Sequence, residues 1–572
     1  MTSLPVNELL ITLEDGANQA DVKAALTDLL PGAAVIEVNT NSGTATAHNF
    51  VRMFKSMSYL FPVLSYAVAI MIVVSTLTRM VENQRIQMGT LKALGFPAKT
   101  IRNHYLAYAL VPSMVGSVAG LIAAQFTLPD AIWAMLMHNS RMPWMLRAPI
   151  SPVSWVACAA TVVLSVLVCW IVYRKAARET TAELLRPKPP KSGSRILLER
   201  WKGLWQRLSF NGKMVIRNIF RNKGRSFLSL VGVFFCNMLI VCSFSLQDSI
   251  PQMIADHYTK TLVYDVRAEL DTTADTLHSY RVRIPAAAVE GIMEKGVSAM
   301  GKSGIRSCTL TVVPAGQTSL HLGENQSVLQ LPESGACISR KLGKLLDIGL
   351  GDTLTVYFTG DDEPVRLPVV CFAETNIGQG IYMSETAYKA LRKGGFAPTA
   401  LLISGIDENT VHVLEEMDEV TDLKYPENQR RQTAGIMDST TLIFSILSGV
   451  ALLLAFIICY NMGLMNFTER TRDYATLKVL GYHQKEIRRL MMREQEIISL
   501  IATALSVYPG MLLTSIILKL CEMENMVFTT CFKPLSIIKA CVISIVFAWA
   551  IEWLLTRKVK KIDMVEALKS VE

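Results

Sequence analysis

The chain has 572 residues, of which 51% are hydrophobic and only 18% are charged, and its mean hydropathy is +0.32. Such high apolarity and low charge are unusual for a soluble protein, so the composition favours a membrane protein with substantial aqueous parts. The net charge of +9 does not indicate nucleic-acid binding, because no basic segment has a nucleic-acid signature with interleaved aromatic residues.

The eleven cysteines do not form a regular framework, and without a CxxC pair neither a zinc site nor a thioredoxin-like site has support. Six lie in apolar segments, where cysteine behaves as a small hydrophobe: Cys158, Cys169, Cys236, Cys242, Cys459 and Cys541. Cys308, Cys337 and Cys371 lie in a polar region, and Cys521 and Cys531 flank a short loop. Either set could hold a disulfide in an oxidising compartment or remain as free thiols.

The chain begins with a polar segment, residues 1–57, that has strand-like stretches at Leu9–Thr12 and Val35–Val38. A similar order of strand, helix and strand recurs at 401–425. We interpret 1–57 as the C-terminal remnant of a first extracytoplasmic domain.

Seven apolar segments follow, each near the ~20 residues that a helix needs to cross a bilayer. They are placed at about 58–78, 106–128, 153–173, 227–246, 441–462, 497–520 and 536–556. The fold class predicted is therefore a polytopic α-helical membrane protein with about seven transmembrane helices.

The basic residues of the short loops predict how these helices are oriented. The linker 174–225 holds fifteen Lys or Arg residues against three Glu, and the loops 79–105 and 463–496 and the C-terminal tail are also basic. We therefore expect a multi-pass protein of the cell membrane with these segments in the cytoplasm. Residues 247–438, with 26 acidic against 17 basic residues, are then expected outside.

The large polar insert has the mixed pattern of a compact α+β domain. Strand-like segments occur at Leu310–Val313, Thr353–Phe358, Val365–Val370 and Ala400–Ser404. Helical patterns occur at Ala286–Lys295 and Glu385–Lys393. The predicted domains are thus a remnant, a first membrane unit of three spans, a basic linker with an interfacial helix, a span, the α+β ectodomain and a second membrane unit of three spans: 1–57, 58–186, 187–226, 227–246, 247–438 and 439–572.

The interfacial helix of the linker is predicted from aromatic residues that alternate with basic ones. These aromatic residues are Trp201, Trp205, Phe210 and Phe220. Such a pattern is typical of a helix that lies on anionic lipid, so membrane lipids are expected partners.

A thirteen-residue motif occurs twice, at Thr90–Arg102 and Thr476–Arg488, with eight identical positions at a constant offset of 386. Each copy lies between two apolar segments. Each reads as a short basic helix with late Lys residues that complement the helix dipole, ended by Gly95 or Gly481. A loop helix that merely lies on the bilayer is the alternative, but it would not require the same Lys, Gly and Arg spacing in both halves. We interpret the motifs as a duplicated docking surface.

The duplication extends beyond the motif, since Glu183 and Glu566 match at an offset of 383. The second half has the order span, ectodomain, span, docking helix, span, span, whereas the first half lacks the leading span and most of the ectodomain. This order predicts a truncated or split product of a duplicated eight-span protein, with a missing N-terminal portion or a second permease chain as a partner.

Other candidate sites have weaker support. The segment Gly296–Ser303 satisfies the GxxxxGK[ST] phosphate-loop pattern, but a helical pattern precedes it instead of a buried strand, so we expect a surface turn. The eight histidines include no HExxH motif and no pair at metal spacing. Gly116 and Gly120 form a GxxxG pattern in the second predicted span, which is typical of helix contacts.

Three runs resemble the FtsX-like (MacB-type) permease family of ABC transporters, in a duplicated form. They are Thr468–Gly481 with its counterpart Glu82–Gly95, then Arg217–Arg225 before the fourth span, and Ile338–Leu346 followed by Gly351-Asp352. The order of parts agrees over nearly the whole chain. One difference is that Glu82 precedes Gly95 by thirteen residues, whereas Glu469 precedes Gly481 by twelve.

The resemblance implies a permease subunit, not an enzyme, that binds cytoplasmic ABC ATPase subunits. ATP and Mg²⁺ would then be bound by that partner, with no cofactor in this chain. Within the docking helices it implies ATPase contact by Arg85, Lys92, Gly95, Arg472, Lys478 and Gly481. Export or extraction of a lipid, lipoprotein or peptide is the expected activity. The alternative is a non-transporting sensor that relays ligand binding at the ectodomain to a cytoplasmic ATPase.

Overall fold

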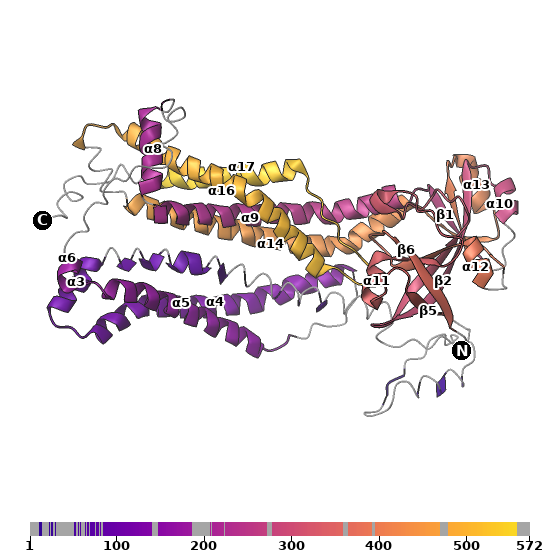
Figure 1. The fold of residues 1–572 in the computed structure, drawn as a ribbon, viewed down its shortest axis with the longest axis horizontal. Coiled ribbons are helices and arrows are strands. Elements are labelled where there is room, and N and C mark those ends of the chain that lie inside the picture. The colour runs from indigo at the N-terminus through magenta and orange to yellow at the C-terminus, as the bar shows by residue number, and fades with distance from the viewer. Residues whose placement is uncertain are drawn as a thin grey trace, which may run out of the picture. The chain divides into compact units, whose positions relative to one another are not determined.

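In the computed structural model of the chain, the described residues are 84–139, 147–185, 209–221, 223–271, 277–358, 364–391, 395–469 and 479–556, with scattered positions between 11 and 81 and Gln206. The chain divides into two compact units, each treated by itself below (Figure 1). We call 1–55, 257–426 and 522–527 the sheet domain, and the rest the helical unit. The predicted remnant 1–57, Trp201, Trp205 and the C-terminal tail lie almost wholly outside the described residues.

The helical unit repeats one order of helices. The first half contains α3 (Arg85–Ala93), α4 (Ala98–Asn139), α5 (Pro152–Ala177) and α6 (Thr181–Leu185). The second half contains α8 (Phe210–Arg221), α9 (Lys223–Asp256), α14 (Pro426–Glu469), α16 (Gln484–Cys521) and α17 (Pro534–Thr556). The amphipathic α8 lies where an interfacial helix was predicted.

Within the described residues, six helices are long and apolar enough to cross a membrane. They are Ala98–Ala134, Pro152–Lys175, Ser229–Thr261, Phe444–Asn461, Lys485–Cys521 and Pro534–Ile551. The chain is therefore a polytopic α-helical membrane protein. The remaining predicted span, 58–78, is described only in part, and there Ala69–Thr78 forms a shorter apolar helix.

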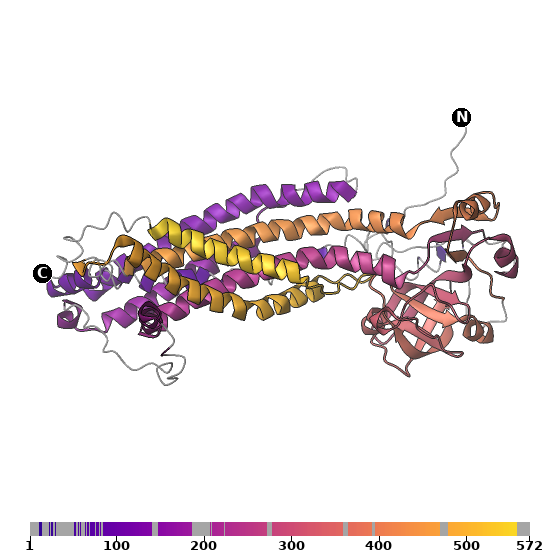
Figure 2. The ribbon, with the colours of Figure 1, turned by 90° about the horizontal axis from the view of Figure 1, so that it is seen from above.

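The second-half helices α9, α14, α16 and α17 run alongside one another (Figure 2). Small and β-branched side chains fill the space between them, including the buried Cys236, Ala455 and Ala540. Asn237 of α9 donates from Nδ2 to Ser506 Oγ of α16 at 2.7 Å and to Thr503 O at 3.3 Å. Small residues and interhelical hydrogen bonds are the usual means of helix packing in lipid, where apolar burial between helices gains little.

The first-half helices pack through two clusters. Leu77 of the first predicted span packs with Ala109 of α4 and Cys169 of α5. Near the start of α4, Tyr105 stacks on Tyr173 of α5, with ring centroids 5.9 Å apart. The two halves meet where Asn461 Nδ2 donates to Thr76 Oγ1 at 3.2 Å.

The sheet domain is built on one sheet, for which nine strands fall in the described residues. They are β1 (Val266–Leu270), β2 (Ala288–Gly301), β3 (Gly304–Val313), β4 (Ala336–Ser339), β5 (Thr353–Phe358), β6 (Val365–Ala373), β7 (Gly380–Ser384), β8 (Ala400–Ser404) and β9 (Val420–Lys424). The order is β3-β7-β4-β6-β5-β2-β8-β1-β9, and β2 also pairs with β3. This second pairing closes six of the strands into a barrel, which β8, β1 and β9 extend.

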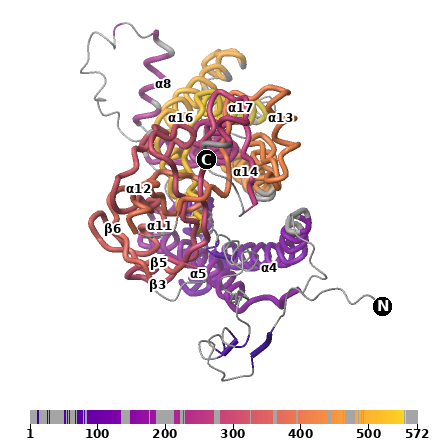
Figure 3. The backbone as a smooth tube through the Cα atoms, turned by 90° about the vertical axis from the view of Figure 1, so that its right-hand side faces the viewer, coloured from indigo at the N-terminus to yellow at the C-terminus, as the bar shows by residue number. Residues whose placement is uncertain are grey.

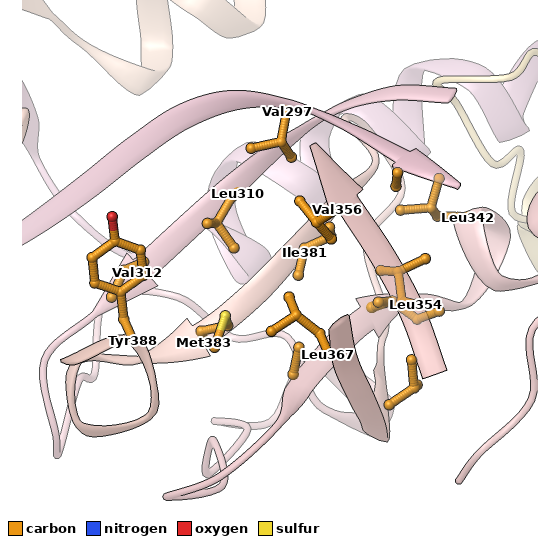
Figure 4. Packing of buried hydrophobic residues seen from close by; sticks show 14 of the residues in the cluster. Val297, Leu310, Val312, Leu342, Leu354, Val356, Leu367, Ile381, Met383 and Tyr388 are labelled. Atoms are coloured by element: carbon orange, nitrogen blue, oxygen red, sulfur yellow. The ribbon is translucent and has the colours of Figure 1, made fainter. Parts of the chain in front are cut away.

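The barrel interior is filled by alternate side chains of its strands (Figure 4). Leu310, Ile338, Leu354, Val356 and Ile381 are fully buried there. A second core lies on β1 and β8 beneath α10 (Leu277–Arg283) and α13 (Glu408–Glu415). Two more short helices, α11 (Arg340–Leu346) and α12 (Glu385–Leu391), follow β4 and β7. The strands and the helix predicted at 385–393 are confirmed, as is the α+β class.

The predicted helix at Ala286–Lys295 is wrong, because this segment belongs to the long strand β2. Its spacing of Val289, Ile292 and Met293 suits a helix, but β8 and β3 pair with it and their pairing overrides local preference. The phosphate-loop pattern Gly296–Ser303 consequently lies in β2 and the tight turn to β3. The turn includes Lys302, whose Nζ is 2.8 Å from Asp352 Oδ2, and no helix N-terminus faces it to receive a phosphate.

One disulfide joins neighbouring strands of the barrel, between Cys337 of β4 and Cys371 of β6. Both disulfides and free thiols were left open for this region by the sequence. Cys308 is free.

Candidate coupling corners

The repeated motif forms a helix, a tight turn and the start of a second helix. In the first copy α3 ends at Leu94, and Gly95 takes a left-handed conformation with φ of 84°. Gly95 N donates to Lys92 O at 3.2 Å and Phe96 N donates to Leu91 O at 3.1 Å, which together are the two hydrogen bonds of a Schellman motif. The predicted C-cap glycine is confirmed, and α4 begins three residues later.

Two basic residues of α3 fix this helix to the end of α5. Arg85 Nη2 lies 2.5 Å from Glu179 Oε2, and Arg85 Nε donates to the same oxygen at 2.7 Å. Lys92 Nζ donates to Ala177 O at 2.9 Å and to Glu179 O at 3.3 Å. Because Lys92 binds carbonyls at the C-terminal end of α5, its charge also complements the dipole of that helix.

The same helix packs closely on α6. A Cβ added to Gly89 would lie 3.0 Å from Leu184 Cβ, so the glycine permits close approach of the two helices. Leu184 and Met88 are fully buried. At the start of α6, Glu183 Oε2 accepts from Thr180 N and Thr180 Oγ1, each at 2.9 Å, as in a capping box.

These contacts leave an apolar turn facing outward. Leu94 is 70% exposed and Phe96 is 48% exposed, on either side of Gly95. Ile101, one turn into α4, is buried and anchors the turn from beneath. A protruding apolar turn on a rigid support is typical of an interaction surface.

The second copy has the same turn, within a motif of which residues 470–478 lie outside the described region. Gly481 has φ of 90°, Leu480 is 69% exposed and Tyr482 is 37% exposed. Ile487 is buried, as its counterpart Ile101 is. His483 N donates to Glu486 Oε2 at 2.9 Å, which caps the start of α16.

We call Leu94–Gly95–Phe96 and Leu480–Gly481–Tyr482 the coupling corners. Of the six residues predicted to contact an ATPase, Gly95 and Gly481 form the turns. Arg85 and Lys92 hold the first corner in place from within the chain, and their contact with an ATPase remains a prediction. Arg472 and Lys478 lie outside the described residues.

The sequence analysis did not single out the exposed apolar residues of the corners or the partner Glu179. A signal for the former was present, because Leu is identical and an aromatic residue is retained at the repeated positions. Among the described residues no group of three or more His, Cys, Asp or Glu side chains could hold a metal ion. The corners therefore have the chemistry of a protein-binding surface.

A second feature ties the chain between α16 and α17 into the sheet domain. Residues Glu522–Val527 cluster with that domain, although the sequence assigned them to the second membrane unit. Gly378 N donates to Asn525 O at 3.0 Å, and Val527 N donates to Asn376 O at 2.8 Å. Lys341 Nζ lies 2.5 Å from Glu522 Oε2, with both side chains mostly buried. We call 522–527 the strap.

Together the repeat, the apolar helices and the sheet domain define a polytopic membrane protein built from two copies of one membrane unit. The profile of the FtsX-like permease C-terminal domain matches the chain twice, over residues 59–182 and 445–564. The chain belongs to the FtsX-like permease family and carries the family's membrane unit in duplicate. A comparison with curated proteins found no match for this chain.

Proposed function

We propose that this chain is the permease subunit of an ABC transporter and that each coupling corner docks on an ATPase subunit in a separate polypeptide. The family is that of ABC transporter-type membrane components, which associate with an ABC ATPase. The observation that supports the docking site is the exposed Leu–Gly–aromatic turn, which occurs at both copies of the motif. ATP and Mg²⁺ are bound by the partner in this proposal.

The corners are cytoplasmic in this proposal, and the sheet domain lies outside. The excess of Lys and Arg in the loops next to the corners supports this orientation. The disulfide between Cys337 and Cys371 also supports it, because disulfides persist in oxidising compartments and are rare in the cytosol.

The proposed work is export or extraction of a lipid, lipoprotein or peptide. The spans favour this over ion conduction, because ionisable residues that line an ion pathway are scarce in them. In α5, for example, no charged residue precedes Arg174.

The test is binding of the full chain, in mild detergent, to its ABC ATPase. Replacing both Leu94 and Leu480 by Glu places a charge at the centre of each corner, so Kd should rise by at least about tenfold per corner. Ile86→Glu is a matched control, because Ile86 is equally exposed on α3 but lies outside the corner. Its counterpart in the repeat is Arg472, so a charged side chain is native there. Unchanged binding by the double variant would contradict the proposal.

A further inference from the structure

A row of small residues runs along one face of α4: Ser113, Gly116, Ser117, Gly120 and Ala124. Nothing lies within 4 Å of a Cβ built on Gly116 or Gly120. Glycine lowers helix stability by about 1 kcal/mol relative to alanine, so two exposed glycines in a membrane helix need a compensating contact. The row alone does not identify that contact.

The internal repeat supplies an independent observation. The offset of 386 that aligns the two motifs also aligns the first residues of α4 and α16, Ala98 and Gln484. The row on α4 then corresponds to another row of small residues on α16: Ser499, Ala502, Thr503, Ser506 and Gly510. Both rows therefore occupy the same face of equivalent helices.

On α16 this face is covered by a membrane-spanning helix, α9. A Cβ added to Gly510 would lie 2.9 Å from Val241 Cβ and 3.1 Å from Met238 O, so the two backbones are in close approach. Ser506 and Thr503 accept the amide hydrogen bonds from Asn237. All five residues of the α16 row are buried.

The equivalent face of α4 has no such cover in the described residues. In its most apolar window only 6% of α4 is buried, against 44% for α16. Seen end-on, α4 lies to one side of α9, α14, α16 and α17 (Figure 3). The helix α9 cannot serve both faces, because it is already packed on α16 and α17.

We propose that the Ser113–Ala124 face of α4 binds a transmembrane helix with the surface chemistry of α9, supplied by a segment outside this sequence. That chemistry is an apolar helix with a side-chain amide at mid-span. A second copy of α4 lacks it, because its small-residue row offers hydroxyls and glycines but no amide. The inference does not depend on the coupling corners or on an ATPase.

The experiment uses the purified full chain in lipid nanodiscs and a synthetic peptide with the α9 sequence, Lys223–Asp256. In the peptide, Cys236 and Cys242 are replaced by Ala, and Val241→Cys provides one thiol. Since Val241 touches Gly510, whose counterpart is Ala124, the chain carries Ala124→Cys. Ile122→Cys, half a helical turn away on the opposite face, is the matched control. Disulfide formation with Ala124→Cys should be about tenfold faster than with the control.

Adding Gly116→Leu and Gly120→Leu should abolish this preference without lowering the melting temperature of the chain, because nothing within the chain touches these positions. By contrast, Gly510→Leu should lower the melting temperature, because Val241 occupies the space it needs. Equal rates at positions 124 and 122 would overturn the proposal. Cross-links between two copies of the full chain instead of with the peptide would also overturn it, in favour of α4 self-association.

Discussion

Arg85 and Glu179 form the ion pair that holds the first coupling helix on the end of α5. Arg85 is mostly buried and makes two contacts with one carboxylate oxygen. We predict that Glu179→Gln loosens α3, since loss of a charged hydrogen-bond partner costs about 1.5 kcal/mol, or roughly tenfold in local opening. Hydrogen exchange of the α3 amides in the full chain measures this.

The double exchange Arg85→Glu with Glu179→Arg restores an opposite pair and should recover most of the protection. Lys99→Gln, an exposed basic residue of the same loop, serves as the control. If Glu179→Gln leaves exchange in α3 unchanged while weakening ATPase binding, the pair has a direct docking role instead of a supporting one.

Glu183 gives the first corner a dependence on pH. The hydrogen bonds from the Thr180 backbone N–H and hydroxyl lower the pKa of Glu183 below its usual value of 4.5. The cap on α6 is therefore fully formed above pH 4.5 and is lost as the pH falls through the lowered pKa. We predict that exchange of α6 amides, referenced to an unstructured peptide at each pH, rises on acidification below 4.5. Glu183→Gln should remove this rise, and a rise that persists in that variant would assign it to another group.

At the scale of elements, the sequence predicted best what depends on local chemistry. The long apolar helices follow from the absence of charge over about twenty residues. The two turns follow from glycines that alone tolerate a left-handed backbone after an apolar helix. Strand β2 was missed because Val289, Ile292 and Met293 fit a helix, and only pairing with β8, over a hundred residues away, makes them a strand.

The strap and the ion pair of Arg85 were missed for the same reason. Glu522 and Lys341 are separated by 181 residues, and Arg85 and Glu179 by 94. Neither pair has a sequence spacing that marks it. By contrast, the exposed Leu and aromatic residues of the corners could have been found, because the repeat retains them at both copies.

The strap makes a prediction at the scale of one connection. The strap segment lies between α16 and α17 in sequence but is hydrogen-bonded within the sheet domain. Movement of either helix can therefore be passed to the sheet domain through this segment. We predict that Val527→Pro, which removes the donor to Asn376 O, frees the strap and uncouples ATPase activity from substrate movement.

The matched control is Val527→Ala, which keeps the N–H and should behave as the native chain. Hydrogen exchange at Asn525 and Gly378 reports release of the strap directly. If Val527→Pro exposes these amides but transport and ATPase activity stay coupled, the strap is a structural tie and no part of the transmission.

For the whole molecule, the two coupling corners have the same shape but different supports. The repeat places Thr471 at the position of Arg85 and Ile562 at the position of Glu179, so the second half lacks both members of the ion pair. Lys92 and Lys478 are identical. The first corner thus has an additional electrostatic brace, which a docked ATPase does not need to supply.

Two corners in one polypeptide predict that one chain binds two ATPase subunits. The mass of the complex in detergent, with an ATPase variant that cannot hydrolyse ATP, should correspond to one permease and two ATPase subunits. Leu94→Glu or Leu480→Glu alone should leave one ATPase bound, and the two together none, whereas Ile86→Glu should leave two. Because the first corner is already braced, it should lose less conformational freedom on docking and retain the tighter-bound subunit. The Leu480→Glu variant should therefore bind its remaining ATPase more tightly than the Leu94→Glu variant, and the reverse order would show that the brace does not pre-organise the first corner.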